Sequence, residues 1–569
     1  MQELPLVRNG KTLLSGIDPV RRAERTADAV SVRERTLYFC PSPLYGYGLA
    51  RLFARLEKEA PDSAILCIEA DSELYELSLK NIDFSLAANK MLRITNICDA
   101  SQLCAFVHDA WGARAFRRLE TIRFSGGWQL FPELYDSLGE ALRREIAVDW
   151  SNALTLTKLG RLYIRNALRN VSLIPQFPSI EKLSFGSSPI LVLGAGPSLD
   201  ETLDAISRRF AQTLAPESRP FKIICVDTCL GALKDRNIVP DLTVILESQH
   251  WNLRDFIGCR GWNVPAAIDL SALPESARML GEGFLFMTPW TNLRIFERLK
   301  EAGLLPAVIP PLGSVGLSAV EIARRTSRGK IICAGLDFSF TADKYHARST
   351  PGHRGKLNAQ TRLHGILNAA AYDTASFSAV SKSGVPVRSN PALQNYRNLF
   401  EQEFADDPRL FDIAGSGLSL GVKTLSIEDA LLLLGEDISN YEPARTNANR
   451  EERDVLKEKT LTFLDGERKR LKDLRDILTG EAAGTSAPEE SETCGPTLVS
   501  RAHCGEERLN ALVDECDYLW AHFPDYSGGR HPDLAENSSG AVSFLKRLRT
   551  EIDPMVRLIE RTRALIFCN

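Results

Sequence analysis

The stretch Ile190-Leu191-Val192-Leu193-Gly194-Ala195-Gly196-Pro197-Ser198-Leu199-Asp200 decides the fold of this chain. Its apolar run lies between Ser188-Pro189 and a glycine pair, which predicts a buried strand. Apolar residues recur at helical spacing after Pro197, and proline suits the first turn of a helix. The stretch therefore predicts a strand, a glycine turn and a helix, with N–H groups and the positive end of the helix dipole at the turn.

Such a turn suits a phosphate group. The third glycine of a dinucleotide fingerprint is absent, and so is the Gly-Lys-Ser/Thr of a P-loop. Taken alone, the stretch fits a plain βα turn without a ligand equally well.

The region around this stretch, residues 186–425, alternates short apolar strands with helices. This pattern predicts a parallel sheet covered on both faces. The expected strands are 190–194, 222–227, 242–247, 265–269, 283–287, 306–309 and 330–335. Ligands of such sheets bind at the carboxyl ends of the strands. By that rule, the polar and glycine clusters that follow the strands lie at one edge of the sheet, and for any single cluster helix capping is the alternative interpretation. The clusters are Gly194 to Ser198, Asp227-Thr228, Glu247-Ser248-Gln249, Asp269, Thr288-Pro289-Trp290, Gly313-Ser314 and Asp337.

The rest of the chain divides around this sheet. We expect a small N-terminal α/β domain over 1–104, with strands at 35–40 and 64–70, and a helical connector over 105–185. The central Rossmann-like domain covers 186–425. Residues 426–569 form a C-terminal helical domain that contains a disordered acidic linker at 479–497. The fold class is therefore α/β, with a central parallel sheet flanked by two smaller domains.

Bulk composition excludes several classes of protein. Of the 569 residues, 69 are Lys or Arg and 73 are Asp or Glu, so the net charge of −4 gives no bias toward nucleic acid or membrane surfaces. No run approaches the roughly 18 apolar residues of a membrane span, and the N-terminus has no signal core. The 12 cysteines include no paired CxxC, so neither a zinc site nor a disulfide framework is indicated. We expect a cytoplasmic protein.

Several spaced motifs within residues 10–425 resemble the motility-associated factor (Maf) family, whose core is shared with the MptE-like pterin diphosphokinases. The motifs are Leu193 to Leu199, Asp227, Pro240-Asp241 and Gly335-Leu336-Asp337-Phe338. Flanking stretches agree, namely Gly16 to Arg25, Arg165-Asn166 with Asn170, and Asp412 to Gly421. Because several motifs combine, the resemblance is much more specific than the glycine turn alone.

The segment Pro310 to Phe338 is similar to the CMP-binding segment of bacterial sialyltransferases. In that family a Gly-Pro-Ser turn and a Ser-Gly element hold the nucleotide, and a tyrosine grips the phosphate. The resemblance implies nucleotide-binding roles for Gly194, Ala195, Gly196, Pro197, Ser198, Gly313, Ser314 and Tyr345. The position of Asp227, Thr228, Glu247 and Ser248 at the same edge of the sheet adds these four residues to the candidate nucleotide site.

Together the two resemblances imply one activity, the transfer of a nonulosonic (sialic-acid-like) sugar from CMP to Ser or Thr hydroxyls of flagellin. They imply no obligatory cofactor or metal. The partners would be the CMP-sugar and flagellin, with homo-oligomers forming through the C-terminal helices.

The expected general base departs from the sialyltransferase pattern, because the comparable region 384–390 holds no histidine. An acceptor hydroxyl needs a base with a pKa near working pH. His346 is the first candidate and Asp337 the second, a surface loop histidine being the alternative for His346. Arg388, Lys382 and Arg348 are candidates for the sugar carboxylate, a solvated basic loop being the alternative for each. Arg348 lies in the charged segment 341–361, which we expect to act as a lid.

Two other functions stay open. Asp227, Glu247 and Asp337 could bind magnesium, as an ATP-dependent pterin diphosphokinase requires. Alternatively, the chain is a non-catalytic flagellin-binding factor that uses its helical tail.

Overall fold

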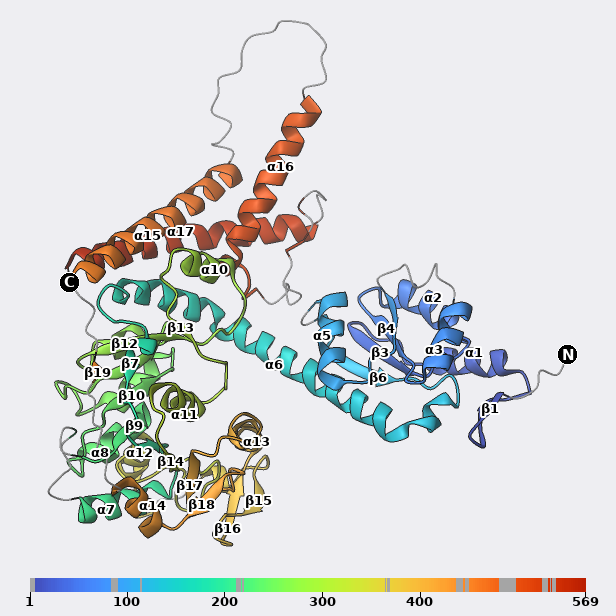
Figure 1. Cartoon of the computed structure of the whole chain (residues 1–569). Helices are drawn as coiled ribbons and strands as arrows, with labels where there is room; N and C mark the ends of the chain where they lie inside the picture. Colours follow the sequence, from blue (N-terminus) through green and yellow to red (C-terminus); the bar gives the residue numbers. More distant parts are fainter. Residues whose placement is uncertain are drawn as a thin grey trace, which may run out of the picture. The chain divides into compact units, whose positions relative to one another are not determined.

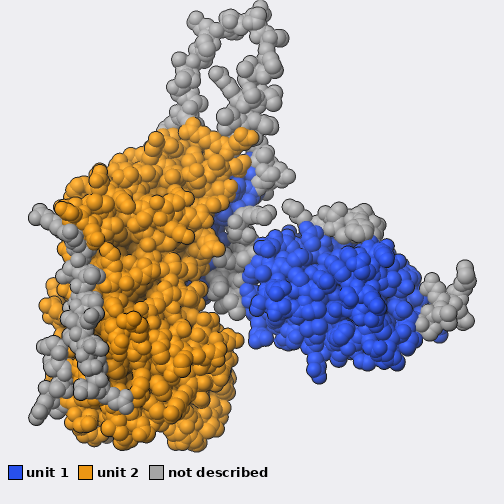
Figure 2. All heavy atoms as spheres, in the orientation of Figure 1, with its two compact units in different colours: residues 1–160, 520–544 blue, residues 161–519, 545–569 orange. Residues whose placement is uncertain are grey.

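The structure is a computed structural model. It describes residues 6–82, 91–112, 115–210, 216, 219–363, 365, 369–435, 444–445, 450–479, 498–523, 531–532, 534 and 539–568. The chain forms two compact units, one of residues 1–160 with 520–544 and one of residues 161–519 with 545–569 (Figure 2). Each unit is described by itself.

The smaller unit contains a four-stranded parallel sheet in the order β5-β4-β3-β6 (Figure 1). Its central strands match the two expected from the sequence, whereas β5 lies where no strand is predicted and β6 lies in the predicted helical connector. Both faces of the sheet are covered by apolar clusters, as a parallel sheet requires. The elements are β1 Leu6–Arg8, β2 Lys11–Leu14, α1 Pro19–Ala29, β3 Thr36–Pro41, α2 Leu49–Glu59, β4 Ala64–Ile68, α3 Ser72–Asn81, β5 Leu92–Thr95, α5 Ala100–Trp111, β6 Arg118–Thr121 and the first part of α6 Pro132–Asn170.

The larger unit is built on a nine-stranded parallel sheet in the order β13-β12-β11-β10-β9-β8-β14-β17-β18 (Figure 1). From β8 the chain builds the sheet in one direction as far as β13, then returns to the other side of β8 with β14. The pair β8 and β14 is therefore the switch point, where ligands of open α/β sheets bind. The strands are β8 Ile190–Leu193, β9 Lys222–Val226, β10 Leu242–Ile245, β11 Ala266–Asp269, β12 Gly283–Met287, β13 Ala307–Val308, β14 Ile331–Ala334, β17 Leu410–Ile413 and β18 Lys423–Leu425.

Helices and two small sheets complete this unit. Helix α11 lies across β8, β9, β10 and β14, and α7 contacts α14. A hairpin of β15 and β16 stands apart from the main sheet, and β7 pairs with β19. The bounds are β7 Leu183–Ser184, α7 Leu199–Arg209, α8 Leu230–Lys234, α9 Pro274–Ala277, α10 Arg294–Glu301, α11 Val315–Thr326, α12 Pro351–Ala359, β15 Phe377–Val380, β16 Pro386–Ser389, α13 Pro391–Phe404, α14 Ile427–Gly435 and β19 Ala444–Arg445.

The predicted fold class is confirmed. All seven strands expected between 190 and 335 exist, and their observed ends differ by at most two residues from the expected ones. Strands β17 and β18 are additional to the prediction, because each is short and the exposed ends of β18 give no apolar run.

The C-terminal helices are α15 Arg450–Thr479, α16 Leu498–Glu515 and α17 Ser539–Cys568. Buried Glu467 of α15 accepts hydrogen bonds from Arg298 of α10, with Nε–Oε1 at 2.6 Å and Nη2–Oε2 at 2.9 Å. Helix α15 is thereby joined to the unit that holds the large sheet. The expected linker lies, from residue 480 on, outside the described residues.

The cysteines that the structure describes are all free thiols. Cys225, Cys229 and Cys333 are buried in the sheet region, as their apolar surroundings predict, and burial raises the pKa of each thiol. Among the described helices, none has the length and apolar composition that a membrane crossing demands.

Candidate functional site

The glycine turn after β8 is packed directly against the turn after β14. A Cβ on Gly196 would lie 2.5 Å from Asp337 Oδ2 and 2.7 Å from Gly335 O, so only glycine fits. The Gly196 N–H donates to Gly335 O at 2.8 Å. Ser198 donates to Asp337 from its backbone N–H (2.7 Å) and from its hydroxyl (2.5 Å). The carboxylate of Asp337 therefore occupies the start of α7, where the sequence suggests a phosphate.

Asp337 belongs to a buried charged network with Lys382 and Asp412. Lys382 Nζ lies 2.6 Å from Asp412 Oδ2, and the two side chains are 2% and 0% exposed. Burial raises the pKa of both Asp337 and Asp412, while Lys382 opposes that shift. The Lys382 N–H also donates to Gly417 O. Lys382 is engaged in this network, so its ammonium is not presented to a sugar carboxylate.

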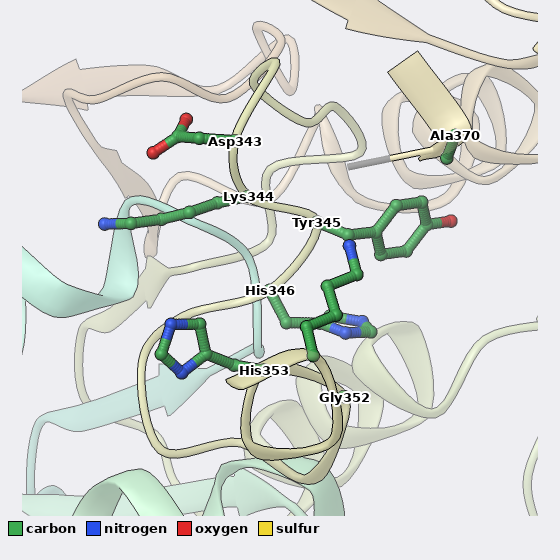
Figure 3. A pocket seen from close by; sticks show the side chains of 8 residues that line it. Asp343, Lys344, Tyr345, His346, Gly352, His353 and Ala370 are labelled. Atoms are coloured by element: carbon green, nitrogen blue, oxygen red, sulfur yellow. The ribbon is translucent and has the colours of Figure 1, made fainter. Parts of the chain in front are cut away.

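The loop after β14 frames a cavity of about 330 Å³ (Figure 3). The Ala347 N–H donates to Ala195 O at 2.9 Å, which ties this loop to the glycine turn. Figure 3 shows Tyr345 and His346 leaving the loop on the side where Ala370 lies, whereas Asp343 and Lys344 leave it on the other. The lining residues are Asp343, Lys344, Tyr345, His346, Gly352, His353, Lys356 and Ala370.

Tyr345 is held in place by its neighbours. Its ring stacks on Phe340, with centroids 5.0 Å apart and planes 22° apart, and its side chain hydrogen-bonds with Asn390. Burial raises the pKa of Tyr345, so the phenol keeps its proton at neutral pH. A protonated phenol at a cavity wall can donate to an anionic oxygen.

His346 lies edge-to-face against Tyr345, with ring centroids 4.9 Å apart. Burial lowers the pKa of His346 to about 4, and the nearby charge of Lys356 adds to the shift. The imidazole is therefore neutral at pH 7 and has a free nitrogen lone pair. A pKa of about 4 nevertheless lies well below the working pH that an efficient general base matches, so His346 is a weak base in the ligand-free chain.

The start of α11 supplies a second helix N-terminus at the same edge of the sheet. Ser314 is its N-cap and is half-buried, and no hydrogen bond from its hydroxyl to another described residue is present. Gly313 has φ +70°, and a Cβ there would lie 3.1 Å from the ring of Tyr396. Tyr396 also interacts electrostatically with Tyr345. Tyr396 and Asn390 thus link the α11 start to the cavity, and no sequence motif singles out either of them.

The expected residues at the ends of β9 and β10 form a separate acidic cluster. Asn252 donates to Asp227 Oδ2 (2.6 Å) and to Asp255 Oδ2 (3.2 Å), and the Thr228 N–H donates to Asp227 Oδ1. Burial raises the pKa of Asp227 to about 6 and that of Asp255 to about 7. Glu247 Oε1 accepts from the Gln249 N–H. In the part of the chain that is described, no three His, Cys, Asp or Glu side chains are grouped as a metal ion requires.

Two asparagines of α6 hold the loops at this edge. Asn166 Nδ2 donates to Ser248 O (2.9 Å) and Ser271 O (3.1 Å), and Asn170 Nδ2 donates to Leu270 O (3.0 Å) and Ala272 O (2.8 Å). Both side chains are buried. Their spacing of four residues is the signal that the sequence offers, because it places both amides on one face of the helix.

The other two expected carboxylate-binding residues are engaged elsewhere. Arg348 pairs with Asp200 and Asp204 of α7 at 3.3 and 3.2 Å. Arg388 Nη2 donates to Ser376 O (2.8 Å) and holds the β15–β16 hairpin. The cations that line the cavity are Lys344 and Lys356. The structure thus brings together Tyr345, His346 and the glycine turn, and keeps Asp227, Thr228, Glu247 and Ser248 in their own cluster.

Comparisons with known proteins give a family match for part of the chain. Residues 163–343 match the family model described as 6-hydroxymethylpterin diphosphokinase MptE-like. This match spans β8 to β14, the glycine turn and Asp337. The chain is also 29% identical over 551 residues to an uncharacterized protein of Treponema pallidum (strain Nichols), covering 95% of this chain and 90% of that protein.

Among solved structures, the Maf glycosyltransferase of Magnetospirillum magneticum AMB-1 has a similar fold. The two structures align with a TM-score of 0.52 and 13% sequence identity, over 99% of this chain and 85% of the other. The likeness extends along the whole chain and shows that the fold is shared.

Proposed function

We propose that this chain, which carries an MptE-like domain at residues 163–343 and folds as a Maf glycosyltransferase does, is itself a glycosyltransferase whose donor is a CMP-activated nonulosonic sugar. The observation that carries the proposal is the cavity lined by Tyr345, His346 and Lys356 beside the glycine turn. A donor sugar, a leaving phosphate and an acceptor hydroxyl need a hydrogen-bond donor, a cation and a base at one place, and this cavity offers all three.

The transfer step uses these side chains as follows. The acceptor oxygen attacks the anomeric carbon, the bond from that carbon to the phosphate oxygen breaks, and CMP leaves with the electron pair. The proton of the acceptor hydroxyl passes to the lone pair of neutral His346. The Tyr345 phenol donates to the phosphate oxygens as negative charge builds on them. Lys356 faces the sugar carboxylate.

The nucleotide is assigned to the start of α11 rather than to the start of α7. Asp337 already accepts the Ser198 donors at α7, and a phosphate there would meet its carboxylate. The Ser314 hydroxyl and the first N–H groups of α11 supply donors near Gly313 and Tyr396. The acceptor, on the Maf resemblance, is a Ser or Thr hydroxyl of flagellin.

A binding experiment tests the donor assignment. Isothermal titration with CMP should give a measurable Kd, whereas UDP and ATP at the same concentration should bind at least 10-fold more weakly. Ser314→Ala and Tyr345→Phe should each weaken CMP binding about 10-fold, the loss of roughly one charge-assisted hydrogen bond. Tyr372→Phe is the matched control, because Tyr372 is 68% exposed and does not line the cavity.

A transfer assay tests the activity. CMP-nonulosonate with flagellin should release CMP and raise the mass of flagellin by one sugar. His346→Asn should bind CMP as the parent chain does but lose at least 100-fold in turnover. If ATP with hydroxymethyl-dihydropterin gives AMP instead, the diphosphokinase alternative replaces this proposal. If no CMP is released and the His346 variant still supports glycosylation in cells, the chain is a binding factor.

A further inference from the structure

A second cavity of the larger unit, of about 190 Å³, lies between the end of α6 and α17. Its lining contains four arginines and one carboxylate, together with the apolar residues Pro554, Met555 and Leu558. The charged residues are Arg161, Arg165, Arg557, Arg561 and Glu551. None of them takes part in the cavity at Tyr345.

The arginines form two pairs with the same spacing. Arg161 and Arg165 are four residues apart on α6, and Arg557 and Arg561 are four residues apart on α17. Residues at this spacing lie on one face of a helix, and like charges there destabilise it by a few tenths of a kcal/mol. Each helix therefore places two like-charged arginines at the same cavity.

Only one carboxylate of the described residues offsets this charge. Glu551 Oε2 lies 2.9 Å from Arg161 Nε, and the Glu551 side chain is 12% exposed. Within the described ranges, Arg165, Arg557 and Arg561 make no ion pair or hydrogen bond. Three solvent-exposed guanidinium groups thus line a cavity in which the described chain pairs none of the three with an anion of its own.

The geometry points to a binding site for a diphosphate-class anion. Guanidinium groups bind phosphate oxygens with two parallel N–H donors, and a diphosphate presents one phosphoryl group to each arginine pair. The cavity is smaller than the roughly 300 Å³ at which pockets for drug-sized ligands begin, so it suits a small anion. The anion relieves the repulsion within each pair, which makes its binding stabilising.

The site also has a connection to the sheet edge. Arg165 precedes Asn166, whose amide holds the loops after β10 and β11. An anion at Arg165 therefore acts on the helix that fixes these loops, although the binding site itself does not require that coupling.

Calorimetric titration with sodium pyrophosphate, at fixed ionic strength, tests the site. The full chain should bind pyrophosphate at least 10-fold more tightly than orthophosphate, and raising the salt concentration should weaken binding. The double variant Arg165→Gln/Arg557→Gln should lose at least 30-fold in affinity. Arg549→Gln should lose nothing, because Arg549 lies on the same α17 and is exposed as the cavity arginines are, but does not line the cavity.

The melting temperature of the double variant and pyrophosphate binding by Tyr345→Phe provide two further tests. Without ligand, the double variant should melt at the same temperature as the parent chain or higher, since a repulsion has been removed. Tyr345→Phe should leave pyrophosphate binding unchanged. Equal affinity for pyrophosphate and orthophosphate, an equal loss in Arg549→Gln, or a loss confined to Tyr345→Phe would each overturn the proposal.

Discussion

Both carboxylate oxygens of Asp337 accept hydrogen bonds from Ser198, one from the backbone N–H at the start of α7 and one from the hydroxyl. A helix start can bind an external anion, but a capping side chain often takes that place. In this chain an aspartate from the neighbouring turn supplies the negative charge. We therefore interpret Asp337 as a positioning residue that joins two turns of the sheet edge.

His346 gives a prediction about pH. Its pKa is lowered to about 4 in the folded chain, against 6.5 for a free histidine. Between these values the unfolded chain binds a proton that the folded chain does not, so stability falls as the pH drops from 6.5 to 4. The loss is up to about 3 kcal/mol, because each pKa unit corresponds to about 1.4 kcal/mol.

Urea unfolding of His346→Gln and the parent chain, at steps from pH 7.5 to pH 4, checks this. The difference in unfolding free energy between the two should be constant above pH 7 and should shift in favour of the variant as the pH falls. A difference that does not vary with pH would show that His346 is solvated in solution.

The sequence predicts some residues of the candidate site and misses others. The resemblance to sialyltransferases singles out Tyr345 after the β14 turn, and His346 is its neighbour in the sequence; both side chains line one cavity. The sequence marks Lys382 only as a nearby cation, and nothing in it shows that Asp412, thirty residues away, pairs with that lysine in the core. Asn390 and Tyr396 escape prediction, because contacts between a loop and a later helix leave no local pattern.

At the scale of elements, the close packing of the glycine turn against the β14 turn leaves no room for a side chain at residue 196. Gly196→Ala would place a methyl group 2.5 Å from Asp337 Oδ2, closer than any carbon–oxygen contact that a folded chain tolerates. Either the turn or the β14 loop must move, and we expect a loss of about 1–3 kcal/mol as an overpacked contact. Thermal and urea unfolding measure it.

Gly355→Ala is the control for this turn. Gly355 lies in α12 and a Cβ there meets nothing within 4 Å, so the substitution should gain about 0.5–1 kcal/mol from helix propensity. Equal effects of the two substitutions would mean that the close approach of the two turns does not exist in solution.

The asparagines of α6 give a second prediction for an element. Asn170→Ala removes two hydrogen bonds and leaves the buried carbonyls of Leu270 and Ala272 without that donor. Buried groups left unsatisfied cost about 1–3 kcal/mol. Chemical denaturation should show this loss. Lys158→Ala, on an exposed position of α6, should change stability by less than about 0.5 kcal/mol, and a similar loss there would contradict the assignment.

Elements with strong local patterns are predictable from the sequence. The seven strands from 190 to 335 are apolar runs bounded by turn residues, and each exists. The pairing of β14 with β8 does not follow from such patterns, because strand order depends on contacts between segments far apart in the chain. Strand β6 has no clear signal either, since Arg118 and Glu120 alternate with other residues in a run of only four.

At the scale of the whole molecule, Glu467 joins helix α15 to helix α10 of the unit that contains the large sheet. It is 1% exposed and accepts from Arg298, Arg470 and Tyr518. Glu467→Gln leaves the Arg298 guanidinium without its carboxylate, and breaking a buried pair in this way costs about 3–5 kcal/mol. The loss should appear in the calorimetric transition of the unit that holds the nine-stranded sheet.

Glu458→Gln is the matched control, since Glu458 is exposed on the same α15 and forms no ion pair with a described residue. It should leave the transition unchanged. If Glu467→Gln instead lowered only a separate, small transition, the helices would unfold independently of the sheet.

The order of strands has a consequence for synthesis in the cell. Strand β8 leaves the ribosome early, but its neighbour β14 and the Gly417–Leu418 backbone that closes over Asp337 follow much later. Until then the nascent chain has an open edge at the middle of its future sheet, a state in which unpaired strands invite aggregation. Translation that stops after Val308 and before Ile331 yields chains that have β8 but lack its neighbour β14, and these chains should therefore depend on chaperones.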